Sequence, residues 1–334
     1  MNLSVVMPVF NAEKYLKESI ESILNQTYQD FEFLILNDCS TDGSLDIIND
    51  FAAQDSRIQV FDFKENKKPA FIRSFAVKEA KTHLIAFADA DDVYLPKRFE
   101  TQVNYMQTHP EIDICGTWFK LFGTSIESQI IKHKPENQQI KARFLVDSHI
   151  GFPTAIVRKK VFETISFDKS YFPIEDYEFL AKATKQYTFY NLQKVLVNYR
   201  WHDTNVSHTA NTKLESLHFK VRHKLFNLLF EKQYTFSESL IYLYALKYQT
   251  QLENIKLIDV LKAGKEILDY EMNLEFRNEL EIIINEAREV YLFKSKKIDF
   301  QVITFLKKSC KPFYNSLDFK FKKRLYKKMI KNFL

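Results

Sequence analysis

Three carboxylates crowd into four positions directly after an apolar run, and this acid cluster is the segment best suited to chemistry. The run covers Leu84 to Ala88, and Asp89, Asp91 and Asp92 follow it. Carboxylates held this close repel one another, so water, a cation or donors from a ligand must compensate their charge. Hard oxygen ligands suit Mg²⁺ or Mn²⁺, which also bind substrate phosphates. The cluster alone leaves two interpretations open, a divalent-metal site and a solvated acidic turn.

The segment that carries the acid cluster is predicted to end an alternating pattern of strands and helices. Apolar strands are predicted at Leu3 to Met7, Phe33 to Leu36, Ile58 to Phe63 and Leu84 to Ala88. Between them, apolar residues at helical spacing predict helices containing Leu16 to Leu24, Leu45 to Ala52 and Ala70 to Lys81, with Asn11 capping the first. This order predicts an α/β fold with a doubly wound, mostly parallel sheet.

The ends of these strands carry polar residues that such a sheet would bring together. Ligands of doubly wound sheets bind at the carboxyl ends of the strands. Pro8 to Asn11 follow the first strand, Asp38 follows the second, and the acid cluster follows the fourth. Asp38 on its own is more typical of a turn or a helix cap. Its position at a strand end favours a ligand contact.

Composition excludes several classes of protein. The chain has 334 residues, 46% of them hydrophobic, which supports a sizeable core. Only five glycines are present, and neither a Walker loop nor a dinucleotide fingerprint occurs. Three widely spaced cysteines, Cys39, Cys115 and Cys310, suit reduced thiols in the cytoplasm. The start of the chain lacks the pattern of a signal peptide, and no apolar run reaches the length of a membrane span.

The positive charge is concentrated at the C-terminal end. Residues 301–334 contain ten Lys or Arg and one Asp, a balance of +9 within a total of +5, so residues 1–300 sum to −4. Apolar residues from Phe319 to Leu334 alternate with these lysines. The pattern fits an amphipathic helix on an anionic membrane surface, or a last helix that packs its apolar side on the protein. No recognition motif accompanies the charge, so no nucleic-acid partner is predicted.

Several segments resemble the inverting family 2 glycosyltransferases, which have the nucleotide-sugar-binding GT-A fold. The first is Val5-Val6-Met7-Pro8-Val9-Phe10-Asn11-Ala12-Glu13-Lys14-Tyr15-Leu16. Others follow in the family's order: Gln26-Thr27-Tyr28, Phe33 to Gly43, Asn66, Arg73, Ala80, Asp89 to Pro96, Pro153-Thr154, Arg158, Glu175 to Phe179 and Tyr199 to His202. Lys68, Ala76 and Thr82 stand where that family usually has glycine. The resemblance covers about residues 1–210.

For the donor side, the resemblance implies a UDP-sugar and a divalent metal, Mn²⁺ or Mg²⁺. Asp91 would bind the metal beside the diphosphate. His202, in the setting Tyr199-Arg200-x-His202-x-x-x-Val206-Ser207, would be a further contact to the metal, or else to the diphosphate, and a structural or exposed histidine is the alternative. Asp89 would contact the ribose, and Asp38 would accept from the base. The remaining donor-site residues implied are Pro8, Val9, Asn11, Arg73 and Ala90. For Arg73, a salt bridge on the helix surface is the alternative.

For the acceptor side, the resemblance implies that Asp176 is the catalytic base and that Glu175 orients or binds the acceptor. Inversion in a single displacement needs such a base. The alternative for this acid pair is a first helical turn before Phe179, and both roles are compatible. Asp92, Thr154 and Trp201 are the other acceptor candidates, although a buried position is an equal expectation for Trp201.

Taken together, these expectations describe two regions. Residues 1–211 would form the catalytic GT-A domain, and residues 212–334 a helical, basic extension for acceptor, dimer or membrane contacts. The resemblance is closest to lipooligosaccharide enzymes that add β-1,3-linked N-acetylglucosamine. Relatives that transfer galactose, glucose or N-acetylgalactosamine share the same motifs. A noncatalytic sugar-nucleotide-binding subunit is the rival interpretation, and a cytoplasmic protein, peripheral on the membrane's inner face, is the expected location.

Overall fold

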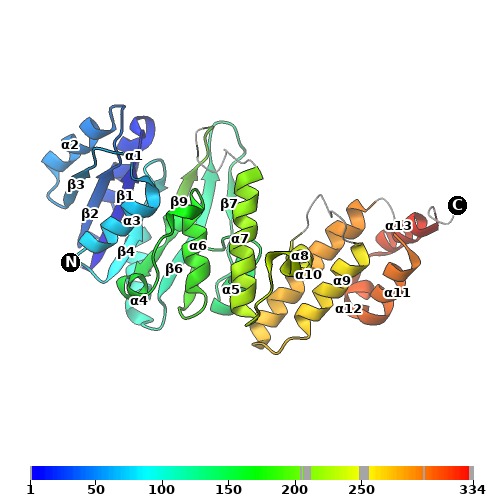
Figure 1. Ribbon diagram of the computed structural model, residues 1–334. Coiled ribbons are helices and arrows are strands. Elements are labelled where there is room, and N and C mark those ends of the chain that lie inside the picture. Colours follow the sequence, from blue (N-terminus) through cyan, green and yellow to red (C-terminus); the bar gives the residue numbers. More distant parts are fainter. Residues whose placement is uncertain (1, 204, 206–211, 248–255, 296–297, 331–334) are drawn as a thin grey trace. The chain divides into compact units, whose positions relative to one another are not determined.

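The computed structural model describes residues 2–203, 205, 212–247, 256–295 and 298–330 (Figure 1). The chain divides into two compact units. The first comprises Met1–Ile140 and Asp147–Val221, and the second comprises Lys141–Val146 and Arg222–Leu334. The domain boundary that the sequence predicts between residues 211 and 212 remains a prediction.

One mixed sheet forms the centre of the first unit. Its strands are β1 (Leu3–Val9), β2 (Phe31–Asn37), β3 (Ile58–Asp62), β4 (Leu84–Phe87), β5 (Val93–Tyr94), β6 (Ile114–Phe122), β7 (Gln129–Ile131), β8 (Ile156–Arg158) and β9 (Phe189–Arg200). They lie in the order β3-β2-β1-β4-β8-β6-β9-β5, with β7 paired to β6. The first four strands are mutually parallel, as predicted. β6 and β9 are also parallel, whereas β5, β7 and β8 pair antiparallel to their neighbours.

Helices cover this sheet and connect its strands. They are α1 (Glu13–Leu24), α2 (Ser44–Gln54), α3 (Lys68–Glu79), α4 (Arg98–Thr108), α6 (Glu175–Ala183) and the starts of α5 (Asn137–Phe144) and α7 (Thr212–Leu229). β2 and β4 are buried along their whole length, which explains the apolar runs at residues 33–36 and 84–87 within them. A core cluster joins these strands to α1 through Leu16, Ile20 and Ile23, each of which is fully buried. The predicted parallel α/β half of the fold is confirmed.

The prediction that Asn11 caps the first helix is wrong. Ala12 occupies the N-cap of α1, and no side chain caps this helix. Asn11 instead has a φ of 51°, and its side-chain Oδ1 accepts a 2.8 Å hydrogen bond from the backbone N–H of Thr41. Asn11 therefore ties the loop after β1 to the loop after β2.

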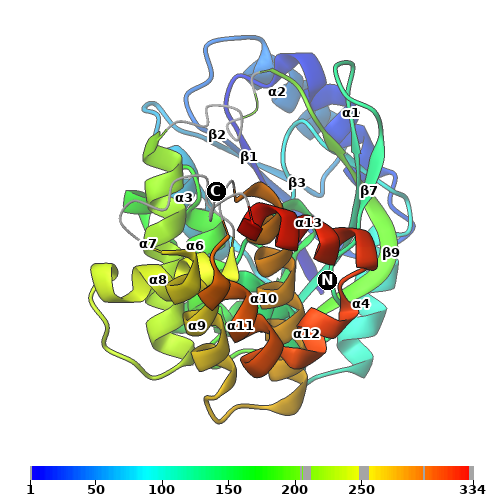
Figure 2. The ribbon, with the colours of Figure 1, turned by 90° about the vertical axis from the view of Figure 1, so that its right-hand side faces the viewer.

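The second unit is helical. After the end of α7 it contains α8 (Phe236–Leu246), α9 (Leu257–Leu268), α10 (Leu274–Lys294), α11 (Phe300–Ser309), α12 (Lys311–Ser316) and α13 (Phe319–Ile330), as Figure 2 shows. Thr235 and Glu238 form a capping box at the start of α8. Ile258, Leu292, Leu306 and Leu325 belong to one apolar core that joins α9, α10, α11 and α13. Among the described residues, no helix combines the length and the apolar character that crossing a membrane requires.

α13 has an apolar side that packs on the protein and an outer side that does not. Leu325 is only 1% exposed, whereas Phe319 is 78% and Ile330 is 53% exposed. Lys328 donates hydrogen bonds to the backbone carbonyls of Leu292, Phe293 and Ser295, at the end of α10. One sequence-based alternative, packing of the last helix on the protein, therefore holds for this inner side. Phe333 and Leu334, which the pattern also included, lie outside the described residues.

Candidate active site

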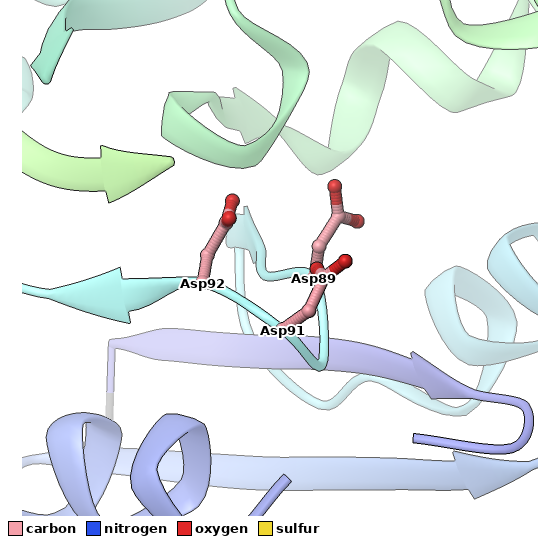
Figure 3. A group of neighbouring side chains, drawn as sticks. All are labelled: Asp89, Asp91 and Asp92. Atoms are coloured by element: carbon pink, nitrogen blue, oxygen red, sulfur yellow. The ribbon is translucent and has the colours of Figure 1, made fainter. Parts of the chain in front are cut away.

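The loop between β4 and β5 holds the acid cluster (Figure 3). Asp89, Asp91 and Asp92 each offer a carboxylate oxygen, and these three oxygens all lie within 4.8 Å of one another. The hydroxyl of Tyr94 accepts a 2.6 Å hydrogen bond from the backbone N–H of Asp89 and lies 3.1 Å from the carbonyl of the same residue. Tyr94 therefore fixes the backbone at the first acid of the cluster.

The acids of the cluster have different surroundings. The side chain of Asp89 is 34% exposed, and desolvation raises its pKa to about 7 against the opposing effect of Arg73. Asp92 is fully buried. Burial, with the nearby charges of Asp91 and Asp89, raises the pKa of Asp92 well above its usual value. Its Oδ1 accepts a 2.8 Å hydrogen bond from the Arg200 N–H, and its Oδ2 has no hydrogen-bond partner in the described chain.

Asp91 meets the segment that follows β9. Its Oδ2 lies 2.9 Å from Nε2 of His202 and accepts a 3.3 Å hydrogen bond from Nδ2 of Asn205. Its backbone carbonyl accepts a 2.7 Å hydrogen bond from Nε of Arg200. The pair of Asp91 and His202 implied by the sequence is therefore together, 111 positions apart. Val206 and Ser207 of the same motif lie outside the described residues.

This arrangement fits a divalent cation. Adjacent ligands of an octahedral ion with 2.0–2.1 Å bonds lie about 3 Å apart, close to the observed Asp91–His202 contact. Asp89 and Asp92 supply two further carboxylates within the same 4.8 Å group. One oxygen of Asp92 is buried and unpartnered, and buried carboxylates are normally paired or bound to a metal. The donor set of oxygens and one imidazole suits Mn²⁺ or Mg²⁺.

Arg73 joins the acid cluster to the predicted catalytic pair. From α3, its Nη1 donates a 2.6 Å hydrogen bond to Oε1 of Glu175, and its Nη2 lies 3.9 Å from Oδ1 of Asp89. Its guanidinium lies over the rings of Phe152 and Phe167, at 4.8 and 6.0 Å from their centroids. Its side chain is 11% exposed. Arg73 is therefore a largely buried link between distant segments, and the alternative of a salt bridge on the helix surface is wrong.

Glu175 and Asp176 begin α6 and have different environments. Glu175 is 3% exposed, and its Oε2 has no hydrogen-bond partner in the described chain. Burial raises the pKa of Glu175, and the Arg73 charge partly offsets this effect. Asp176 is half-buried, and its Oδ1 accepts a 2.7 Å hydrogen bond from the N–H of Tyr177. Asp176 thus begins a helix and keeps a carboxylate oxygen for another contact.

Two loops extend the site along the sheet edge. Asp38, which is 4% exposed, accepts hydrogen bonds from the backbone N–H groups of Lys67 and Lys68 at 2.6 and 3.0 Å. Its own N–H donates to the carbonyl of Val9 at 2.8 Å. Pro8 pairs with Leu36 in the parallel ladder. These contacts hold the ends of β1 and β2 and the start of α3 together.

The predicted acceptor residues lie in less open positions. Thr154 is 1% exposed. Its hydroxyl donates to the Gly151 carbonyl at 2.7 Å and accepts from the Thr117 N–H at 3.1 Å. Asp92 is fully buried, as described above. The backbone N–H of Trp201, which directly follows β9, donates to the carbonyl of Phe122, the last residue of β6. Thr154 and Asp92 therefore have contacts that stabilise the fold, whereas Trp201 lies beside His202 in the chain.

Comparison with known proteins gives the family. A family description, "Glycosyl transferase family 2", matches residues 4–166. An uncharacterized glycosyltransferase of Methanocaldococcus jannaschii is 32% identical over 279 residues, which cover 79% of this chain and 95% of the relative. The chain belongs to glycosyltransferase family 2. It is therefore a transferase enzyme.

Other known proteins agree with this family and with the fold. The O-antigen biosynthesis glycosyltransferase WbnJ of Escherichia coli is 29% identical over 232 residues, 67% of this chain and 89% of the relative. The crystal structure of residues 1–349 of S. aureus TarS in complex with UDP-GlcNAc superposes with a TM-score of 0.57 at 17% identity. The match covers 87% of this chain and 91% of that chain. The predicted GT-A fold is confirmed.

Sequence reasoning missed several residues that surround the acids of this family 2 transferase. Arg200 and Asn205 contact Asp91, and Tyr94 holds Asp89. Arg98 is fully buried beneath the cluster, where desolvation lowers its pKa to about 10 and the charges of Asp92 and Asp89 oppose that effect. Tyr94 and Arg200 lie inside the motifs, which was a usable signal. Asn205 carries no comparable signal.

Proposed function

We propose that this family 2 member is an inverting transferase that moves a sugar from a UDP-sugar to a hydroxyl group of a surface-glycan acceptor. The arrangement of Arg73 carries the proposal. This guanidinium contacts Glu175 and approaches Asp89, so it links the cluster of acids that fits a cation to the Glu175-Asp176 pair. A noncatalytic nucleotide-binding subunit would need the acid cluster but would not need the Glu175-Asp176 pair.

For the donor we propose UDP-N-acetylglucosamine. Support comes from the S. aureus TarS structure, whose bound ligand is UDP-GlcNAc, and from the sequence resemblance to N-acetylglucosaminyltransferases. Transfer of galactose, glucose or N-acetylgalactosamine is the alternative. For the acceptor we propose a lipooligosaccharide or a capsular glycan, and the O-antigen assignment of the relative WbnJ supports a cell-surface polysaccharide.

On the donor side, we propose that Pro8, Val9 and Asn11 line the base pocket and that Asp38 accepts from the base. Asp89 and Ala90 would contact the ribose. Asp91 and His202 would hold the divalent ion. When bound, this ion stabilises the negative charge that develops on the leaving diphosphate. Arg73 positions Asp89 and Glu175, because both of its charged contacts are to those carboxylates.

On the acceptor side, we propose that Asp176 is the catalytic base. As the acceptor oxygen attacks the anomeric carbon, its proton passes to the Asp176 carboxylate, and a new carbon–oxygen bond forms. The bond between the anomeric carbon and the phosphate oxygen breaks, and its electron pair leaves with UDP. Attack opposite the leaving group inverts the anomeric configuration. Glu175, fixed by Arg73, would orient the acceptor, with Trp201 near the same site.

A glycolipid acceptor would lie at the cytoplasmic membrane, so we also propose that the protein binds its inner, anionic surface peripherally. The outer side of α13 supports this proposal, because it presents Lys320, Lys323 and Lys327 together with Phe319 and Ile330, all of them exposed. Lysines interspersed with exposed apolar side chains are typical of surfaces that bind anionic lipid. A homodimer through the helical region is the alternative.

The decisive experiment measures UDP release from a panel of UDP-sugars in the presence of Mn²⁺ and a glycan acceptor library. Turnover with one donor, an inverted product linkage and loss of turnover on chelation are expected. Tight UDP binding without turnover for any donor or acceptor would favour the noncatalytic subunit. Absence of both UDP binding and turnover would overturn the proposal.

A further inference from the structure

Backbone strain gathers at the edge of the sheet where the donor is proposed to bind. In the described chain, the non-glycine residues with positive φ are Asn11 (51°), Cys39 (62°), Lys68 (70°) and Glu231 (50°), and no glycine has a positive φ. The first three lie after β1, after β2 and at the start of α3. A left-handed backbone costs an L side chain free energy that glycine avoids. Such strain tends to persist where a side chain is needed for function.

Two of these three strained residues have side-chain contacts that explain why glycine does not occupy their positions. Asn11 accepts the Thr41 N–H through Oδ1 at 2.8 Å. The thiol of Cys39 donates to the carbonyl of Lys64 at 3.5 Å. Both contacts tie neighbouring loops together, so these side chains stabilise the loops themselves.

The ammonium group of Lys68 differs, because among the described residues it has no hydrogen-bonded or ion-paired partner. The backbone N–H of Lys68 donates to Asp38 at 3.0 Å, a bond that glycine would make equally well. Its side chain is exposed, and among the described residues no carboxylate oxygen is paired with its Nζ. The nearest defined contact of Nζ is the ring of Phe172, whose centroid is 5.7 Å away. The neighbouring Lys67 differs, because its ammonium pairs with Glu65 at 2.7 Å.

The location of Lys68 connects the two halves of the proposed site. Its main chain contacts Asp38, the proposed base contact. Its side chain reaches Phe172, which lies three residues before Glu175 and four before Asp176. A sugar nucleotide that extends from Asp38 toward the Glu175-Asp176 pair would pass this ammonium. The anionic groups such a donor can carry are its diphosphate and a carboxylate on its sugar.

We propose that Lys68 is a donor-positioning residue whose ammonium pairs with an anionic group of the sugar nucleotide. This inference rests on the proposed function and adds a residue to it. In this proposal the left-handed backbone is retained because it places a cation between Asp38 and Phe172, where glycine would relieve the strain but supply no charge. An exposed ammonium pairs with phosphate or carboxylate oxygens as a point charge, so the interaction weakens with salt.

The test compares variants that separate charge from strain. Lys68→Met removes the charge and keeps the strain, Lys68→Gly removes both, and Lys68→Arg keeps the charge. Lys67→Met is the matched control, since its backbone makes the same kind of bond to Asp38. Calorimetry would give the affinities of uridine, UMP, UDP, UDP-glucose and UDP-glucuronate, each with Mn²⁺ and at two salt concentrations.

We expect Lys68→Met and Lys68→Gly to weaken the binding of an anionic ligand about tenfold, a typical loss for one charge-assisted contact, and to leave uridine unaffected. Lys68→Arg and Lys67→Met should stay close to the wild type. Lys68→Gly should unfold at a higher temperature than Lys68→Met while it binds as weakly. If Lys68 only stabilised the fold, Lys68→Gly would not combine a higher melting temperature with a weaker affinity.

The ligand series identifies the anionic group. An equal loss for UDP, UDP-glucose and UDP-glucuronate assigns the contact to the diphosphate. A loss confined to UDP-glucuronate assigns it to a sugar carboxylate. If the wild type binds UDP but both uncharged variants bind every ligand as the wild type does, the inference about Lys68 is wrong and the proposed function stands. If the wild type binds none of the nucleotides, the proposed function itself fails.

Discussion

Arg73 and Glu175 lie 102 positions apart in the sequence and form a 2.6 Å ion pair between α3 and α6. Glu175 is 3% exposed and the Arg73 side chain 11% exposed, so solvent screens this pair little. The same guanidinium approaches Asp89 in the acid cluster. The contact fixes the position of α6, and therefore of Asp176, relative to the loop that carries the metal-ligand candidates.

Replacing one member of this ion pair should lower the free energy of unfolding more than replacing both members. Arg73→Met leaves a buried carboxylate without its partner and should lower the free energy of unfolding by about 3–5 kcal/mol. The double variant Arg73→Met with Glu175→Gln should recover part of this loss, because no unpaired charge remains. Urea unfolding of the four members of the cycle measures the coupling. Lys17→Met, which breaks the exposed 4.0 Å pair with Glu21, is the control and should cost about 0.5 kcal/mol or less. Additive losses would contradict the coupling.

Asp176→Asn should separate binding from chemistry. The amide preserves the size of the side chain but cannot take the acceptor proton, so the rate of transfer should fall by about 10²–10⁴-fold. Affinity for UDP should stay within about twofold of the wild type. Steady-state UDP release and calorimetry measure the two quantities. Asp50→Asn, on the exposed side of α2, is the matched control. Unchanged turnover in Asp176→Asn would exclude this residue as the base.

Asp91 and His202 should both be required for tight metal binding. Asp91→Asn should weaken Mn²⁺ affinity most strongly, and His202→Gln should weaken it about 10–100-fold, the usual range when a supporting group at a metal site is lost. Titration with Mn²⁺, followed by electron paramagnetic resonance, measures affinity without turnover. His83→Gln provides an exposed histidine as the control. Equal Mn²⁺ affinities in all four proteins would place the ion elsewhere.

The pH dependence of stability should report on Asp89. Desolvation raises its pKa in the folded protein to about 7, above the value of about 3.9 for an unfolded chain. The folded state therefore binds this proton more tightly. The stabilisation is complete below about pH 4 and is lost as the pH rises through about 7.

Asp89→Asn should consequently raise the melting temperature of the metal-free protein more at pH 8 than at pH 5. Scanning calorimetry of the wild type and the variant at both values measures the difference, with Asp50→Asn as the control for loss of an exposed carboxylate. Mn²⁺ at pH 8 should raise the melting temperature of the wild type by a larger amount than that of Asp89→Asn. The same increment at both pH values would mean that Asp89 is ionised throughout this range.

Half of the sheet could be predicted from the sequence because burial leaves a local pattern. β2 and β4 are buried along their whole length, and the apolar runs that mark them, residues 33–36 and 84–88, are followed by Asn37 and Asp89. The second half lacks this signal. β8 has three residues, and β6 and β9 contain buried polar residues such as Thr117 and Asn191. The pairing of β6 with β9 joins residues 75 or more positions apart, and no local periodicity encodes such a contact.

The candidate site likewise has a part that the sequence predicts and a part that it does not. Motif spacing identified the acids, Arg73 and His202, whose contacts agree with a shared site. The partner of Arg73 could not be predicted, because a guanidinium on a helix surface and one buried against Phe152 have the same sequence pattern. For Thr154, the sequence pattern indicated a ligand contact, but its hydroxyl makes contacts within the fold. It lies in a matched motif, but the Gly151 carbonyl and the Thr117 N–H occupy its hydroxyl, so a motif position alone does not distinguish a fold contact from a ligand contact.

The outer side of α13 should bind anionic vesicles. Lys320, Lys323 and Lys327 are exposed beside Phe319 and Ile330, and each lysine near an anionic surface contributes about 1 kcal/mol. Flotation with phosphatidylglycerol vesicles should recover the wild type at low salt and lose it at about 0.5 M salt, since screening shortens the range of the attraction. Changing the three lysines to Glu should abolish binding, and Phe319→Ser with Ile330→Ser should weaken it.

The control is a triple variant in which Lys17, Lys78 and Lys262 are changed to Glu, because it has the same net charge as the first variant. If both triple variants lose vesicle binding equally, the binding depends on net charge and not on α13. Because the inner side of α13 packs through Leu325, none of these substitutions removes a core contact, and melting temperatures should stay close to that of the wild type.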